Sequence, residues 1–229
     1  MENGNDINVV KQFDNIASLP DKWDHNRQYQ NYLLKNIPKN CNCILDVGCG
    51  TGELTKKLTS YGKKVIGIDI SENMLHEAHK RNSDEKIEYI KTSVEDYLEE
   101  TDKRFDIIIS TAALHHMNEE RILKTMKDKL IENGKILILD IVKEKTVMDY
   151  FLSIIAVILN PIIMLVMDGR LRVSKNEREA WEEHFQYDKY LTITEVKNIA
   201  KKVLGKAKIK KHLFWRYSLI YSNGPELDI

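Results

Sequence analysis

Short aliphatic runs alternate along the chain with longer segments in which apolar residues recur every three or four positions. The runs are rich in Ile and Val and nearly continuous, which is typical of strands covered on both faces of a parallel sheet. They predict strands at residues 43–47, 64–69, 86–91, 105–110 and 135–141. The segments between them predict helices at 52–61, 72–81, 94–99 and 119–131. This alternation indicates an α/β fold.

The two ends of the chain add helices and a hairpin. Residues 24–36 predict a helix before the first strand, and Thr192 and Glu195 form a capping box that opens a helix over 192–204. Residues 206–213 and 214–222 follow as candidate strands, and Asn133-Gly134 reads as a helix stop and turn. We expect one domain over 1–229, with an N-terminal helical cap at 1–40 and a helical insertion at 142–190.

Residues 147–167 form an apolar run about long enough to cross a bilayer. A transmembrane span is excluded because it would separate strands that must pair in one sheet. Asn160-Pro161 predicts a break into two short helices. Three interpretations stay open: ordinary core, a hydrophobic lid over a substrate, or a membrane-surface patch. The third is favoured by nearby cations: Lys143, Lys145, Arg170, Arg172 and Lys175.

A glycine-rich turn follows the first predicted strand. Gly48, Gly50 and Gly52 come directly after Asp46. A dinucleotide fingerprint would need glycine at position 53, which is Glu, so the spacing argues against a dinucleotide oxidoreductase. Asp69 ends the next strand, where a carboxylate can accept hydrogen bonds from both hydroxyls of a ribose. The pattern predicts a nucleoside-cofactor site at the edge of the sheet.

These motifs resemble those of the class I S-adenosylmethionine (SAM)-dependent methyltransferases. The resemblance rests on residues 44–52, 105–117 and 134–140, covers roughly 40–141, and is nearest to the small-molecule branch that includes quinone-biosynthesis enzymes. It implies a Rossmann-like, seven-stranded, mostly parallel sheet with a C-terminal antiparallel hairpin and helices on both faces. It weakens after 142, so we expect 142–190 to form a substrate lid.

The resemblance also implies a set of cofactor-binding residues. Asp46 would hold the amino group of SAM through water, Asp69 the ribose, and Ile70 and Met74 the adenine, although Met74 could equally be core. Where the family often has Gly-Asp-Ala, this chain has Thr92-Ser93-Val94. The implied set is Asp46, Gly48, Gly50, Gly52, Asp69, Ile70, Met74, Ser93, Val94, Ser110, Thr111 and Tyr29.

Histidines supply the candidates for catalysis. Methyl transfer is an in-line displacement that needs mainly proximity and exclusion of water, so each histidine could also be a packing residue. His116 is the first choice as base or substrate orienter, followed by its neighbour His115 and by His184; His25 is a further candidate. The chemistry requires no metal.

Composition narrows the partners. Lys+Arg and Asp+Glu both number 35, so the chain has no net positive charge that would attract nucleic acid. The three cysteines and a polar N-terminus without a signal peptide suggest a cytoplasmic protein. We expect a small, apolar or aromatic methyl acceptor, no nucleic acid, possible peripheral membrane contact through 147–167, and a monomer or homodimer. The alternatives are a nucleic-acid or protein methyltransferase, or a non-catalytic SAM-binding regulatory module.

Overall fold

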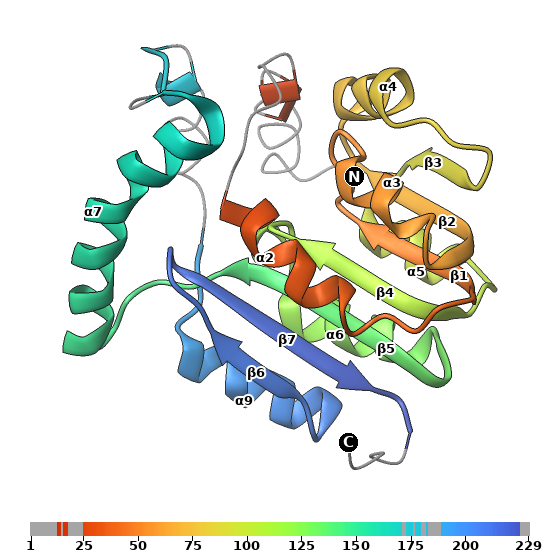
Figure 1. Cartoon of the computed structure of the whole chain (residues 1–229). Helices are drawn as coiled ribbons and strands as arrows, with labels where there is room; N and C mark the ends of the chain where they lie inside the picture. Colours follow the sequence, from red (N-terminus) through yellow and green to blue (C-terminus); the bar gives the residue numbers. More distant parts are fainter. Residues whose placement is uncertain are drawn as a thin grey trace.

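The computed structural model describes residues 13–14, 16–17, 25–170, 173–175, 177–179, 182 and 189–224. Within them, seven strands form one sheet in the order β3-β2-β1-β4-β5-β7-β6 (Figure 1). The strands are β1 (Cys41–Val47), β2 (Gly62–Asp69), β3 (Ile87–Lys91), β4 (Phe105–Thr111), β5 (Leu130–Ile141), β6 (Lys208–Lys211) and β7 (Arg216–Ser222). β7 runs antiparallel to both neighbours, while the pairs from β3 to β5 are parallel. The predicted fold is confirmed.

Helices cover both faces of this sheet. The helices are α2 (His25–Leu34), α3 (Glu53–Leu58), α4 (Glu72–Arg81), α5 (Val94–Glu100), α6 (Glu119–Asp128), α7 (Val147–Asp168) and α9 (Ile193–Leu204), with a 3₁₀ turn η1 (Leu114–His116). α5, α6 and α9 share one hydrophobic cluster, and α2 and α3 share the other. Successive strand residues point to opposite faces, so Ile108 joins the first cluster while Ile107 and Ile109 join the second.

Asn133-Gly134 is not a helix stop, and that prediction was wrong. α6 already ends at Asp128, and both residues lie inside β5. Asn133 has a φ of +61°, and a side chain at Gly134 would come within 2.9 Å of the Phe105 carbonyl oxygen. The pairing of β4 with β5 shifts register beside them. An Asn-Gly pair supplies the backbone freedom that such an irregularity needs, so the same signal marks a distorted strand here.

α7 is one continuous helix, so the predicted break at Asn160-Pro161 was also wrong. Pro161 lies inside it. Proline removes one backbone hydrogen bond, at a cost of roughly 3 kcal/mol. Both ends of α7 are capped, by a box between Thr146 and Asp149 and by Gly169 in the left-handed conformation. The remaining hydrogen bonds over 22 residues therefore outweigh the local loss.

No helix in the described part of the chain is both long and apolar enough to cross a membrane. Figure 1 shows α7 standing at the side of the molecule toward which the carboxyl ends of β4 and β5 point. Its N-terminal end is tied to the body through Lys211 of β6, which contacts Asp149. The helix thus flanks the edge of the sheet where the predicted site residues gather.

Candidate active site

The order of strands reverses between β1 and β4. The chain runs from β1 outward to β3 and then returns to place β4 on the other side of β1. Ligands of open α/β sheets bind at the carboxyl ends of the strands at such a reversal. The turn after β1 and the loop after β4 meet here, because a side chain at Gly48 would collide with Cβ of Ala113.

The three motif glycines have different roles. All have positive φ, at +67° for Gly48, +52° for Gly50 and +79° for Gly52. A side chain at Gly52 would collide with the Tyr89 hydroxyl, so this glycine allows internal packing, as Gly48 does. A Cβ at Gly50 would meet nothing closer than the sulfur of Met74, at 4.0 Å. Gly50 is therefore the motif glycine where a ligand can approach the backbone closely.

Asp69 lies beside this opening. One carboxylate oxygen accepts the Gly50 N–H at 2.8 Å, and the other accepts the Ser71 N–H at 2.9 Å. Burial raises the pKa of Asp69, while these backbone bonds lower it in part. A carboxylate offers about four lone-pair positions, so each oxygen retains acceptor capacity for a hydroxyl. The side chain is thus oriented by the motif turn itself.

Asp46 is almost completely buried in β1. It is 2% exposed and accepts a 2.6 Å hydrogen bond from the Thr55 hydroxyl of α3. Burial raises its pKa to about 7. This contact fastens the start of α3 to β1, which is a structural role. Its predicted role toward the amino group of SAM stays a prediction.

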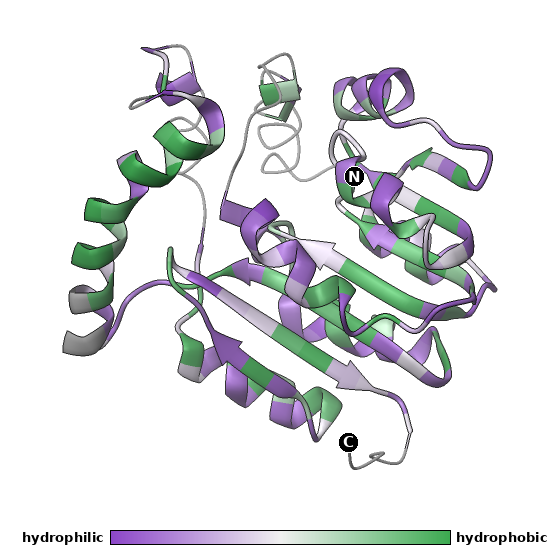
Figure 2. Cartoon of the chain, viewed as in Figure 1, coloured by the Kyte–Doolittle hydropathy of each residue, from purple (hydrophilic) through white to green (hydrophobic). Residues whose placement is uncertain are grey.

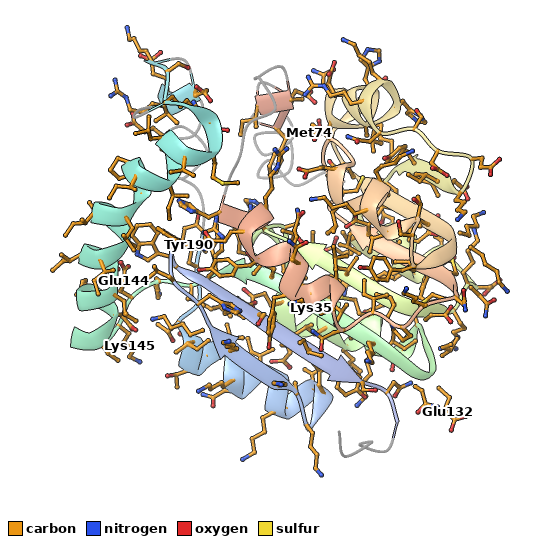
Figure 3. The ribbon with its side chains drawn as sticks, viewed as in Figure 1. Lys35, Met74, Glu132, Glu144, Lys145 and Tyr190 are labelled. Atoms are coloured by element: carbon orange, nitrogen blue, oxygen red, sulfur yellow. The ribbon has the colours of Figure 1, made fainter. Side chains whose placement is uncertain are left out.

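Met74 and Ile70 lie near the turn after β2. Ile70 is half-buried, and Met74 is buried in a small cluster with Ile16 and Ala17 of the N-terminal segment. Figure 3 shows Met74 beside that segment, above the sheet. Both interpretations of Met74 given by the sequence, core and adenine contact, are compatible with this position.

Two further contacts join the N-terminal segment to the site. Asp14 accepts a 2.6 Å hydrogen bond from the Ser71 hydroxyl. The ring of Phe13 meets the His116 ring edge-on, with centroids 5.4 Å apart. The described residues of this segment therefore connect the end of β2 with the loop after β4.

Ser93 and Val94 have structural roles in α5. The Ser93 hydroxyl caps the helix by accepting the Asp96 N–H at 3.0 Å, and Val94 is buried in the core. A capping hydroxyl retains one further acceptor lone pair. Their contacts with adenine stay a prediction.

Ser110 and Thr111 end β4 beside the motif turn. The buried Ser110 hydroxyl donates to the Val47 carbonyl at 3.0 Å and thereby ties β4 to β1. The Thr111 hydroxyl is buried and has no hydrogen-bond partner among the described residues. The next residue, Ala112, has a φ of +53°, which is a strained conformation for a residue with a side chain. Strain and an unsatisfied hydroxyl are both typical of functional sites.

His115 is anchored by Asp140 at the end of β5. Its ring Nδ1 lies 2.6 Å from one carboxylate oxygen, and its backbone N–H donates to the other at 3.0 Å. Burial alone would raise the pKa of Asp140, but attraction to His115 and these hydrogen bonds hold it below its usual value. His116 packs on His115, with ring centroids 4.0 Å apart, and is less buried. Sequence reasoning missed Asp140, although its position at a strand's carboxyl end was a usable signal.

Glu119 and Tyr217 extend this buried polar cluster. Burial and the nearby charge of Asp140 raise the pKa of Glu119 to about 8, and burial together with Asp140 raises that of Tyr217. The ring of Tyr190 lies 5.1 Å from that of His115. The pKa of Asp140 is thus lowered while the pKa values of Glu119 and Tyr217 are raised within one cluster. Shifted pKa values of this kind are typical of functional sites.

Three other predicted residues lie apart from this cluster or outside the described residues. The Tyr29 ring contacts His212, with centroids 4.6 Å apart. His25 stacks on Phe214 at 4.1 Å, and burial lowers its pKa to about 4. His184 falls outside the described residues.

The raised pKa of Glu119 predicts a pH-dependent stability. An ordinary glutamate releases its proton near pH 4.5, so between that pH and about 8 the folded state binds more protons than the unfolded state. The free energy of unfolding therefore falls as pH rises through this window. Urea unfolding at pH 5.5 and 8.5 should show Glu119→Gln gaining stability relative to wild type at the higher pH. Glu120→Gln, which loses an ion pair with Lys202, is the matched control. Its free energy of unfolding should differ from that of wild type by the same amount at both pH values. Equal effects of Glu119→Gln at both pH values would contradict the assignment.

Comparisons with known proteins agree with this geometry. Residues 45–138 match the sequence profile of a methyltransferase domain family. The human mitochondrial ubiquinone biosynthesis O-methyltransferase is 36% identical over 118 residues, covering 49% of this chain and 31% of that protein. The Vibrio atlanticus ubiquinone biosynthesis O-methyltransferase is 27% identical over 138 residues, covering 55% and 57%. This chain thus matches from about a third to just over half of the length of these curated relatives.

A solved structure extends the likeness to nearly the whole fold. The N-methyltransferase NodS from Bradyrhizobium japonicum, in complex with S-adenosylhomocysteine, superposes with a TM-score of 0.65 at 16% identity. The superposition covers 96% of this chain and 100% of that one. The family profile, these relatives and the carboxyl-edge geometry thus agree on a likeness of residues 45–138 to a methyltransferase domain, within a fold shared with methyltransferases.

Proposed function

We propose that the chain transfers a methyl group from SAM to a small, apolar or aromatic acceptor by direct in-line displacement. The observation that carries the proposal is the opening at Gly50 beside an Asp69 carboxylate oriented by the motif turn. That pair offers a close backbone approach and a bidentate acceptor, which is what a nucleoside ligand with a ribose diol requires.

The chain's own residues fit this cofactor. Asp69 would bind the ribose, the backbone at Gly50 would lie under the ligand, and Thr111 would offer its buried hydroxyl from β4. SAM supplies a methyl group already activated by its sulfonium. The protein's contribution is then to align the acceptor with that methyl group and to exclude water.

His116 is the proposed group that orients the acceptor or removes its proton. It is less buried than His115 and lies on the same loop after β4. Asp140 of β5 accepts a hydrogen bond from the His115 backbone and contacts its ring, so these contacts fix the loop that carries His116. His115 is in this account a positioning residue.

The acceptor's chemistry is proposed from the surroundings of the edge. α7 flanks it with a helix that lacks charged residues from Tyr150 to Met167. The ubiquinone O-methyltransferases among the relatives are consistent with a small-molecule acceptor. We place 142–190 as the lid, 1–40 as the cap and the protein in the cytoplasm, consistent with its three unpaired cysteines.

Gly50→Ala should separate ligand binding from folding. The added methyl meets no protein atom closer than 4.0 Å, so it costs only the backbone strain of a positive φ, on the order of 1–3 kcal/mol. It should weaken S-adenosylhomocysteine binding, measured by isothermal titration, by at least roughly tenfold. Gly205→Ala, also at positive φ with nothing within 4 Å, is the control and should retain affinity. Equal affinity of both variants would remove Gly50 from the site.

His116→Gln tests both the reaction and the proposed role of this histidine. Wild-type protein should transfer labelled methyl from SAM to a member of a panel of phenols, thiols and amines. The variant should lower kcat by roughly a hundredfold while cofactor affinity stays within about twofold. His76→Gln on the exposed face of α4 is the control. Unchanged kcat would reject the role, whereas cofactor binding with no transfer to any acceptor would favour a regulatory module.

A further inference from the structure

α7 presents an apolar stripe to solvent between Tyr150 and Val166. Tyr150, Ile154, Val157, Ile158 and Val166 are 59–77% exposed. Their spacing of three, four, seven and eight residues puts them on one side of the helix, together with Ile162 and Leu165. Figure 2 shows hydrophobic colouring over most of the part of α7 that is not drawn in grey. A patch of this kind on a protein surface usually marks an interaction site.

The stripe faces outward because polar contacts hold the opposite side of α7. The Trp215 indole N–H donates to the Ser153 hydroxyl at 2.9 Å and also contacts Glu144. Lys211 contacts Asp149, and Ala156 is 1% exposed. The inner face is thus attached to the β6–β7 end of the sheet, and the exposed orientation of the stripe is built into the fold.

Positive charge gathers at the N-terminal end of the same helix. Lys143 and Lys145 are exposed just before α7, and Lys208 and Lys210 are exposed on β6, whose last residue contacts α7. Figure 3 shows Lys145 beside the base of α7. Residues 189–224 contain eight lysines and one arginine against a single acid, Glu195. The chain is neutral overall, but four exposed lysines, at 143, 145, 208 and 210, lie next to the N-terminal end of α7 or on the strand that contacts it.

We propose that α7 lies in the plane of an anionic lipid bilayer surface. A helix of 22 residues is about 33 Å long, and its uncharged outer side can enter the boundary between headgroups and acyl chains. The neighbouring lysines then meet anionic headgroups, which attract cationic side chains near the membrane surface. The apolar stripe thus matches the acyl chains of the bilayer, and the lysines match its anionic headgroups. The proposal does not depend on methyl transfer.

Vesicle flotation with the full chain tests the proposal. Wild type should bind phosphatidylcholine vesicles that contain one third phosphatidylglycerol, and should bind pure phosphatidylcholine more weakly. Ile154→Glu combined with Ile158→Glu should weaken binding by at least roughly tenfold, because charges would enter the apolar boundary. Both positions are at least 60% exposed, so folding, checked by circular dichroism, should persist.

Lys80→Ala combined with Lys124→Ala is the matched control. It changes the net charge by the same amount at exposed positions of α4 and α6, and should leave binding within about twofold. Absent vesicle binding by wild type, or equal binding by the glutamate variant, would overturn the proposal. So would a lipid-free dimer that the glutamate variant converts to monomer without any vesicle binding, since the stripe would then be a subunit interface.

Discussion

The close contact between the turn after β1 and the loop after β4 is the constraint on which the site depends. It exists because Gly48 has no side chain that would collide with Ala113. The reversal of strand order puts these two segments side by side, and the missing side chain lets them touch. Neighbouring side chains leave the backbone at Gly50 uncovered, and its N–H donates a hydrogen bond to Asp69. From β4, Thr111 and the histidine loop reach the same edge.

A second layer of contacts fixes that loop. Asp140 comes from β5, the next strand along the sheet, and binds His115 through both ring and backbone. It lies in a cluster with Glu119, whose pKa is raised by burial and, to a smaller extent, by the nearby charge of Asp140. Residues from β1, β2, β4 and β5 therefore act on one edge, and each is placed by parallel pairing of its strand.

α7 flanks this edge of the sheet and exposes an apolar side at the surface of the molecule. Its inner side is held by polar contacts to Lys211 of β6 and to Trp215, which precedes β7, and its outer side is apolar. If that outer side enters a bilayer surface, the carboxyl edge lies close to a reservoir of apolar molecules. The proposed apolar acceptor and the proposed membrane binding are then both explained by the uncharged stretch between Tyr150 and Met167.

Much of this arrangement was predictable from the sequence, because strands buried on both faces leave a continuous aliphatic signal. The glycine spacing and the position of Asp69 predicted a nucleoside-cofactor site, because both are local features of the sequence. The pairing of His115 with Asp140 was not predictable, since it joins residues 25 positions apart through strand order. The predictions at Asn133-Gly134 and Pro161 were wrong because these residues can occur in more than one structure. Asn-Gly fits a distorted strand as well as a helix end, and proline can lie inside a long helix. The packing of Ile16 on Met74 likewise depends on a long-range contact.

The most direct test of the central claim is an amide chemical-shift titration of the wild-type chain with S-adenosylhomocysteine. The amides of Gly50 and Ser71 both donate to the Asp69 carboxylate. They should show the largest saturable shifts, because a ligand that occupies Asp69 changes both hydrogen bonds. Amides of β6, which lies at the far edge of the sheet, should stay unchanged. Saturable binding that leaves Gly50 and Ser71 unperturbed, or no binding at all, would contradict the account.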